Sequence, residues 1–320
     1  MKIMTPIRFV PGEAASGEGA TPAPPMDLLD LVLHYHERTK HHYNRYADSL
    51  GYMDWDTQPD PFRRFHGSPL TRLAFPPTDN TPLYSAIFPP GVVTAKPFSF
   101  ETLSAFLFYS LSLTAWKQYG ESRWSLRVNP SSGNLHPTEG YVVAPALPGL
   151  HSQPGVYHYA PKEHGLERRT ELSEEIWKSL MGNFPPGAFL AGFSSVHWRE
   201  SWKYGERAYR YCQHDVGHAL AALRISAALL GWGLYVLDDA PDARVASLLG
   251  IDREDGFLPE ERESPDLLAV VLPGGPLTDF RSRVRDLPED AVGAIARGTW
   301  TGTANRLSSG HCPWEVIDAV

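Results

Sequence analysis

The feature that most constrains the fold is a long stretch near the middle of the chain, Glu206 to Leu230, which contains no proline and one glycine. Apolar residues recur in it at spacings of four and three, at Val216, Leu220, Leu223, Ala227 and Leu230. This spacing places them on one face of an α-helix. We therefore predict a long helix that packs in the centre of a domain or at an interface and ends at Gly231, a residue that favours helix termination.

The composition excludes several classes of protein. The 320 residues are 42% apolar and carry a formal net charge of -8, without a long run of lysine or arginine, so a nucleic-acid or anionic-membrane surface is not suggested. No apolar run approaches the roughly 20 residues of a membrane span. Residues 1–11 lack the apolar core of a signal peptide, and two cysteines make neither a disulfide framework nor a metal site. We expect a soluble, cytoplasmic protein.

The element order favours an α+β fold. Residues 1–25 are expected to be a disordered leader, and residues 26–97 a helical and proline-rich wrap. A helix is predicted from Ser99 to about Tyr119, with Gly120 as its stop. Further elements are predicted as strands at 141–144, 155–159, 234–237 and 267–272 and as a helix at 171–181. Another helix is predicted to open within residues 238–242 and to end near residues 249–250. Helices and strands mix without a regular alternation, and this order favours α+β over a parallel α/β sheet.

A polar loop, Arg127 to Glu139, follows the predicted Ser99 helix and leads into a strand. It reads Arg-Val-Asn-Pro-Ser-Ser-Gly-Asn-Leu-His-Pro-Thr-Glu and concentrates hydroxyls, backbone N–H groups, an amide and an imidazole. Those groups suit a flat, polar, anionic cofactor. The alternative is an ordinary turn before a strand, because proline, serine, glycine and asparagine are turn residues in any case. The loop matches neither a Walker sequence nor a dinucleotide fingerprint.

Two histidines four residues apart, His214 and His218, would share one face of the long helix, with Asp215 after the first. This arrangement is close to the His-Glu-x-x-His pattern of zinc hydrolases, which needs a third ligand such as His311. The alternative is a hydrogen-bonded polar turn of the helix.

Lys203 and Tyr204 precede the long helix and are a candidate proton-transfer pair. A neighbouring cation, and a helix N-terminus, both lower the pKa of a tyrosine from its reference value of about 10. The alternative is a surface lysine beside a packed tyrosine.

Four motifs in order resemble those of the nitroreductase-like FMN flavoprotein superfamily, and within it the SagB-type dehydrogenase (azoline oxidase-like) branch. The loop at 127–137 resembles the family's Arg-x-x-Pro-Ser-(Ala/Ser)-Gly-(Ala/Asn)-x-x-Pro signature. Residues 156–164 resemble its Leu-Tyr-x-Tyr-x-Pro-x-x-His strand, and residues 203–210 its Lys-Tyr-Gly-x-Arg-x-Tyr-Arg entry to a long helix. Residues 215–218 stand where the family has Glu-x-Gly-His.

The resemblance implies a three-layer nitroreductase-like fold, with a central, mostly antiparallel sheet flanked by helices and FMN at the interface of two domains. Residues 98–275 would form the FMN domain. The implied cofactor-binding residues are Arg127, Ser131, Ser132, Gly133, Asn134 and His136 in the loop, and Leu234, Tyr235, Val236, Leu237 and Asp238 after the long helix. Lys203 and Tyr204 would take the substrate proton while hydride passes to the flavin.

The implied function is that of an FMN-dependent oxidoreductase acting on a small-molecule or peptide substrate. The usual Arg-Arg-Ser-x-Arg phosphate motif is missing, so Lys96, or Arg38 and Lys40, are candidate substitutes. A flavin-free scaffold or peptide-binding partner is the alternative. Residues 276–320 are expected to be a C-terminal extension or a linker towards a partner domain, because residues 305–317 resemble the junction to a second domain in tandem members of the family. The chain is therefore expected either to form a homodimer or to pair with a second nitroreductase-like domain.

Overall fold

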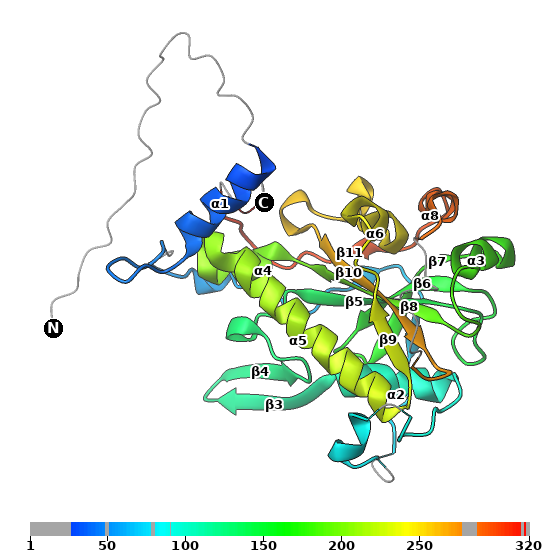
Figure 1. The fold of residues 1–320 in the computed structure, drawn as a ribbon. Coiled ribbons are helices and arrows are strands. Elements are labelled where there is room, and N and C mark those ends of the chain that lie inside the picture. Colours follow the sequence, from blue (N-terminus) through cyan, green and yellow to red (C-terminus); the bar gives the residue numbers. More distant parts are fainter. Residues whose placement is uncertain are drawn as a thin grey trace.

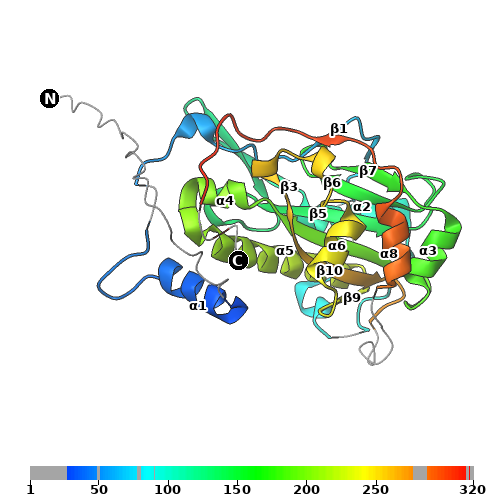
Figure 2. The ribbon, with the colours of Figure 1, turned by 90° about the horizontal axis from the view of Figure 1, so that it is seen from above.

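The computed structural model describes residues 27–48, 51–77, 81–89, 91–276, 287–314 and residue 317. The leader expected at residues 1–25 lies outside these ranges. Figure 1 shows a central sheet with helices on both faces, and Figure 2 shows the same arrangement from above. None of the helices in the described ranges combines the length and the apolar character that a membrane crossing requires.

The sheet has seven strands in the order β2-β7-β6-β5-β8-β10-β9. All six neighbouring pairs are antiparallel. The strands are β2 (Leu70–Arg72), β5 (Thr138–Ala144), β6 (Gly155–Ala160), β7 (Gly165–Glu171), β8 (Phe189–Ser195), β9 (Gly233–Val236) and β10 (Ser264–Leu272). The short strands β1 (Phe65–His66) and β11 (Thr303–Ala304) pair with each other outside it.

Helices cover both faces of the sheet. On one face lie α2 (Phe100–Leu111) and the long helix α5 (Ala208–Leu229), and on the other α3 (Glu174–Met181), α6 (Asp242–Leu249) and α8 (Glu289–Ala296). Because strand side chains alternate, Tyr141 and Val143 of β5 enter the core under α6 and α8, whereas Val142 and Ala144 enter the core under α2 and α5. The α+β, three-layer fold expected from the sequence is thereby confirmed.

The predicted long helix is confirmed at Ala208–Leu229, and Val216, Leu223 and Ala227 of its apolar stripe are buried in the core. Gly231 follows it with a φ of +70°, and a Cβ there would lie 2.6 Å from the carbonyl oxygen of Val93. A short helix, α4 (His197–Tyr204), precedes it, and α1 (Leu28–Thr39) packs on its first turn, where the Tyr35 hydroxyl donates to the Glu206 carbonyl at 2.7 Å.

The helix predicted from Ser99 to Tyr119 is wrong in its second half. Ser99 does cap α2, through a reciprocal pair of hydrogen bonds with Thr102. The helix ends at Leu111, however, and the chain continues as the hairpin β3 (Leu113–Tyr119) and β4 (Ser122–Arg127). Gly120, with a φ of +59°, lies in the two-residue turn of this hairpin and does not terminate a helix.

Buried charges join strands β5, β6 and β7. The ring of His158 contacts Glu139 and Glu167, each at 3.0 Å, and Arg64 contacts Glu167 at 2.7 Å. Burial opposes the charge on His158, but the hydrogen bonds to both carboxylates outweigh it and raise the pKa of His158 to about 9. The imidazolium therefore stabilises the centre of the sheet at neutral pH.

Replacement of His158 should have a pH-dependent cost. Because the folded-state pKa lies above the usual 6.5, the stabilisation is full below about pH 6.5 and is lost as pH rises through about 9. His158→Gln should therefore cost more free energy of unfolding at pH 6 than at pH 9.5, by a few kcal/mol at about 1.4 kcal/mol per unit of pKa shift. Denaturant unfolding at both pH values measures this. The exposed His66→Gln is the control, and an equal pH dependence in the two variants would contradict the prediction.

Candidate functional site

The polar loop predicted from the sequence has an unusual backbone. Residues Ser132–Asn134 form a single 3-10 turn between β4 and β5. Gly133, Asn134 and His136 all have a positive φ, of 61°, 60° and 53°. A positive φ is uncommon in residues that carry a side chain, and here both Asn134 and His136 have one. Backbone strain of this kind concentrates at functional sites. The surrounding contacts must hold the loop in this shape.

Those contacts come from within the loop and from helix α5. The backbone N–H and the hydroxyl of Ser132 both donate to Asp215 Oδ1 at 3.0 Å. The His136 N–H donates to Ser131 Oγ at 2.7 Å, and Asn134 Nδ2 donates to the Ser125 carbonyl at 2.9 Å. Asp215, between the two histidines of the proposed zinc pattern, is therefore a carboxylate that holds the loop.

His136 is buried and neutral. Burial, reinforced by the charges of Arg127 and Arg199, lowers its pKa to about 2. Its Nε2 lies 3.0 Å from Asn134 Oδ1, an acceptor, so Nε2 carries the proton and Nδ1 is the acceptor nitrogen. Nδ1 is buried and has no hydrogen-bond partner among the described residues. The loop thus retains one unused acceptor.

The structure brings the loop and the Lys203–Tyr204 pair together. A Cβ on Gly133 would lie 2.8 Å from the Tyr204 hydroxyl and 2.9 Å from Lys203 Nζ, so a side chain at this position would displace one or both groups. The Tyr204 ring packs against that of Tyr211 on α5, with centroids 4.2 Å apart. The two motifs, about seventy residues apart in sequence, therefore form one surface.

The expectation of a lowered Tyr204 pKa is wrong. Tyr204 is the last residue of α4, and a short 3-10 helix, η4 (Gly205–Arg207), separates it from the N-terminus of α5. Burial, together with the charges of Glu200 and Asp215 and the neighbouring Tyr211, raises the pKa of Tyr204 to about 12. Tyr204 is consequently a phenol at neutral pH.

Arg127 and the 234–238 segment lie apart from this surface in their contacts. Arg127 is buried, donates to the Pro61 carbonyl and stacks over Phe62 at 5.6 Å. Burial lowers its pKa to about 10, so it stays charged at neutral pH. The 234–238 segment begins in β9, and two other strands, β8 and β10, lie between β9 and β5 in the sheet. Leu234, Tyr235 and Leu237 are partly buried, whereas Val236 and Asp238 are exposed.

The cations suggested as phosphate partners differ in their surroundings. Lys96 is exposed beside the end of α5, where its N–H donates to the Leu230 carbonyl at 2.9 Å. Lys40 pairs with Glu37 on α1, and Arg38 lies 3.7 Å from Glu206. Of the three, Lys96 is the exposed one.

The zinc alternative finds no support in the described residues. His214 and His218 are exposed on α5, and His311 contacts Glu261 at 2.9 Å. Among the described residues, no group of three histidine, cysteine or acidic side chains is arranged to hold a metal ion. The carboxylate of this motif accepts from Ser132 instead.

Sequence reasoning missed Glu200, one turn before Lys203 on α4. Its side chain is 0% exposed, and neither carboxyl oxygen has a hydrogen-bond partner among the described residues. Burial, assisted by the charge of Asp215 and opposed by that of Lys203, raises the pKa of Glu200 to about 9. Glu200 is thus a neutral acid beside the candidate pair. Its position three residues before Lys203 was the available signal, but α4 was not predicted.

The Glu200→Gln substitution should stabilise the folded protein, relative to the natural protein, increasingly as pH rises. A carboxyl group whose folded-state pKa is raised from 4.5 to about 9 costs stability progressively between those values, because the unfolded chain ionises first. The glutamine keeps the shape and does not titrate. The melting temperature of the variant, relative to the natural protein, should therefore be higher at pH 8.5 than at pH 5. Glu174→Gln on the surface is the control, and an unchanged difference between the two pH values would refute an ionising buried Glu200.

Comparisons with known proteins agree with the fold. The model of the nitroreductase family matches residues 113–258. A crystal structure assigned to the nitroreductases, from Anabaena variabilis, superposes with a TM-score of 0.56 at 27% identity, covering 75% of this chain and 46% of that one.

Two curated proteins are also similar. The trifolitoxin-processing protein TfxB of Rhizobium leguminosarum bv. trifolii is 32% identical over 38% of this chain and 35% of its own length. MJ1384 of Methanocaldococcus jannaschii, which its name places with the nitroreductases, is 27% identical over 49% of this chain and 77% of its own. The matched region thus spans about a third of TfxB and less than half of the Anabaena protein. The family match and the shared fold agree with the superfamily-level resemblance that the motifs indicated: residues 113–258 are similar to the nitroreductase family.

Proposed function

We propose that this protein is an FMN-dependent oxidoreductase of the SagB-type, azoline oxidase-like branch, and that it oxidises a peptide substrate. The observation that carries the proposal is the position of Gly133 against Lys203 Nζ and the Tyr204 hydroxyl. A concave, polar loop and a pair of proton-transfer groups then share one surface. The name of TfxB, a trifolitoxin-processing protein, supports a peptide as the substrate class.

The residues present fit one edge of a flat cofactor. Because Gly133 has no side chain, Lys203 Nζ and the Tyr204 hydroxyl lie directly against the loop backbone, and His136 Nδ1 is an unused acceptor in the same loop. Ser131 and Ser132 keep hydroxyl lone pairs for further hydrogen bonds, because each hydroxyl has two. Gly133 and Asn134 would supply backbone contacts. Arg127 would act as a fixed positive charge behind the loop.

The second part of the proposed cofactor site, Leu234 to Asp238, begins in β9. Strands β8 and β10 separate this strand from β5, into which the loop leads. A cofactor that contacts the loop of one domain and the 234–238 segment of another would bring the two parts together. This arrangement favours a homodimer, or a pair with a second nitroreductase-like domain, as the active form.

FMN, when bound, supplies a hydride acceptor for the oxidised carbon. Tyr204 stays protonated, so its role is to donate a hydrogen bond to the heteroatom beside that carbon. Lys203 would take the proton that the substrate releases on oxidation. Glu200 and Asp215, buried behind the pair, keep the Tyr204 phenol from ionising.

One observation favours a second candidate, a flavin-free partner that binds peptides. Ser132 and Asn134 already have intramolecular partners, Asp215 and Ser125, and the loop therefore keeps its shape without a ligand. The two candidates differ in a single measurable property, the binding of FMN.

FMN should bind and stabilise the protein. The purified protein should show flavin absorbance, or should take up added FMN with a gain of about 2.7 kcal/mol at 100 times the dissociation constant. Gly133→Ala should weaken FMN binding, because its Cβ would crowd Lys203 and Tyr204. The control is Gly187→Ala, which has a similarly positive φ of 80° and nothing within 4 Å. If the natural protein does not bind FMN, the oxidoreductase proposal is refuted and the flavin-free, peptide-binding candidate is favoured.

Lys203→Met and Tyr204→Phe should keep bound FMN and lose dehydrogenation. Each change removes a proton-transfer or donor group without charge reversal, and losses of roughly 100-fold or more are expected for such groups. Stopped-flow bleaching of the flavin by a thiazoline-bearing peptide measures the step. Lys178→Met on the exposed face of α3 is the control. Undiminished bleaching in either site variant would refute its assigned role.

A further inference from the structure

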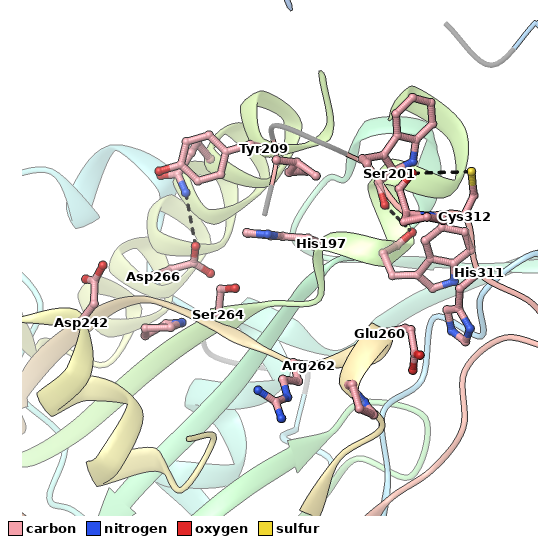
Figure 3. A pocket seen from close by; sticks show the side chains of 17 residues that line it. His197, Ser201, Tyr209, Asp242, Glu260, Arg262, Ser264, Asp266, His311 and Cys312 are labelled. Atoms are coloured by element: carbon pink, nitrogen blue, oxygen red, sulfur yellow. Dashed lines mark hydrogen bonds between the residues drawn. The ribbon is translucent and has the colours of Figure 1, made fainter. Parts of the chain in front are cut away.

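A large cavity lies between the start of helix α5, helix α4 and the chain near the C-terminus. Its volume is about 970 Å³, and its walls include His197 and Trp198 of α4, Tyr209 and Gln213 of α5, and Asp266 of β10. Figure 3 shows the side chains of His197, Tyr209 and Asp266 gathered on one side and those of Glu260 and His311 on the other. The volume is at the upper end of the range for ligand sites.

This cavity is separate from the proposed flavin surface. None of the residues of the polar loop, nor Lys203 or Tyr204, lines it. On α5, Tyr209 and Gln213 are four residues apart and share a face, whereas Tyr211 and Asp215 lie on the opposite face, toward Tyr204 and the loop. The cavity and the flavin surface therefore lie on opposite sides of α5.

The charged lining favours a cation. Three acidic residues, Asp242, Glu260 and Asp266, face the cavity against one arginine, Arg262. His197 adds no charge, because burial lowers its pKa to about 4. Burial also raises the pKa of Asp266 to about 7, and hydrogen bonds from Ser195 and Gln213 hold its carboxyl group. A cation in the cavity would favour the ionised form of Asp266.

Aromatic rings complete this lining. Trp198, Tyr209 and Trp314 contribute to the walls. Rings of this kind attract lysine and arginine side chains through their π faces and pack against the aliphatic parts of those chains.

Two features favour a peptide backbone as well as a cation. Trp198 is 7% exposed and lines the cavity, and its buried indole N–H has no acceptor among the described residues. In β10, residues 264–271 pair with β8, with a bulge at Asp266, but β9 pairs only with residues 269–272. On the β9 side, Ser264, Pro265 and Asp266 therefore have no partner strand in the described part of the chain, and they line the cavity. A free indole donor and an open strand edge are contacts that an extended backbone uses.

We propose that this cavity is a second binding site, which holds an extended peptide segment bearing lysine or arginine side chains. The acidic residues bind the basic side chains, the aromatic rings pack against them, and the Trp198 indole and the edge of β10 contact the peptide backbone. The proposal stands without the flavin chemistry, because none of its residues belongs to the proposed flavin surface.

Calorimetric titration of the full chain, without added FMN, tests the site. The probe is a blocked hexapeptide of alternating threonine and lysine, and the comparison peptide replaces each lysine with glutamate. The lysine peptide should bind and the glutamate peptide should not. Asp266→Asn and Glu260→Gln should each weaken binding about threefold to tenfold, and Trp198→Phe, which keeps the ring but removes the N–H, should also weaken it severalfold.

Glu254→Gln is the matched control, because Glu254 is exposed, lies near Glu260 in sequence and does not line the cavity. The melting temperature of each variant shows that it is folded. Equal binding of the glutamate peptide, or equal weakening by Glu254→Gln, would overturn the assigned site. Binding of lysine amide as tight as that of the peptide would overturn the peptide assignment.

Discussion

The arrangement of the candidate site depends on one buried cation, Arg199 of α4. Its side chain is 0% exposed and donates to the carbonyl oxygens of Asp60 and His136, at 3.0 and 2.8 Å, and it pairs with Glu139. A charge so deeply buried is tolerated only where its partners are fixed. Arg199 therefore locks helix α4 to the polar loop and to the proline-rich segment before β1. These bonds of Arg199 hold α4, and with it Lys203 and Tyr204, close to Gly133. Glu139 also contacts His158, and His158 in turn contacts Glu167. The centre of the sheet and the candidate site therefore form one continuous polar network.

Helices α4 and α5 divide the functional groups between two environments. On one side, Asp215 and Tyr211 contact the loop and the candidate proton-transfer pair. On the other side, His197, Tyr209 and Gln213 line a large acidic cavity. Carboxyl groups with raised pKa values occur on both sides, at the buried Glu200 and at the partly buried Asp266. A short helix followed directly by a long one can present different chemistry to two ligands, because residues four apart share a face and residues two apart do not.

Much of the fold was predictable from local pattern. The spacing of Val216, Leu223 and Ala227 gave the long helix, and the motif at 127–137 gave the loop and its connection to β5. The second half of the Ser99 helix was wrong because Leu113 to Tyr119 carries no proline or glycine, and its strand state depends on pairing with residues 122–127. Helix α4 was missed because its buried face includes Arg199 and Glu200, which are polar in any pattern of apolar residues. The pKa of Tyr204 was predicted in the wrong direction because burial by residues distant in sequence dominates it. The cofactor residues remain predictions.

The hydrogen bonds from Ser132 to Asp215 also place a carboxylate against the loop. A Gly-rich turn with exposed N–H groups is ordinarily a place where anions gather, but here a carboxylate occupies the Ser132 N–H. A phosphate approaching this turn would meet a like charge, whereas an uncharged ring bearing N–H groups would meet an acceptor. For a ligand with one anionic and one neutral end, we expect this carboxylate to favour the orientation in which the neutral end lies toward α5.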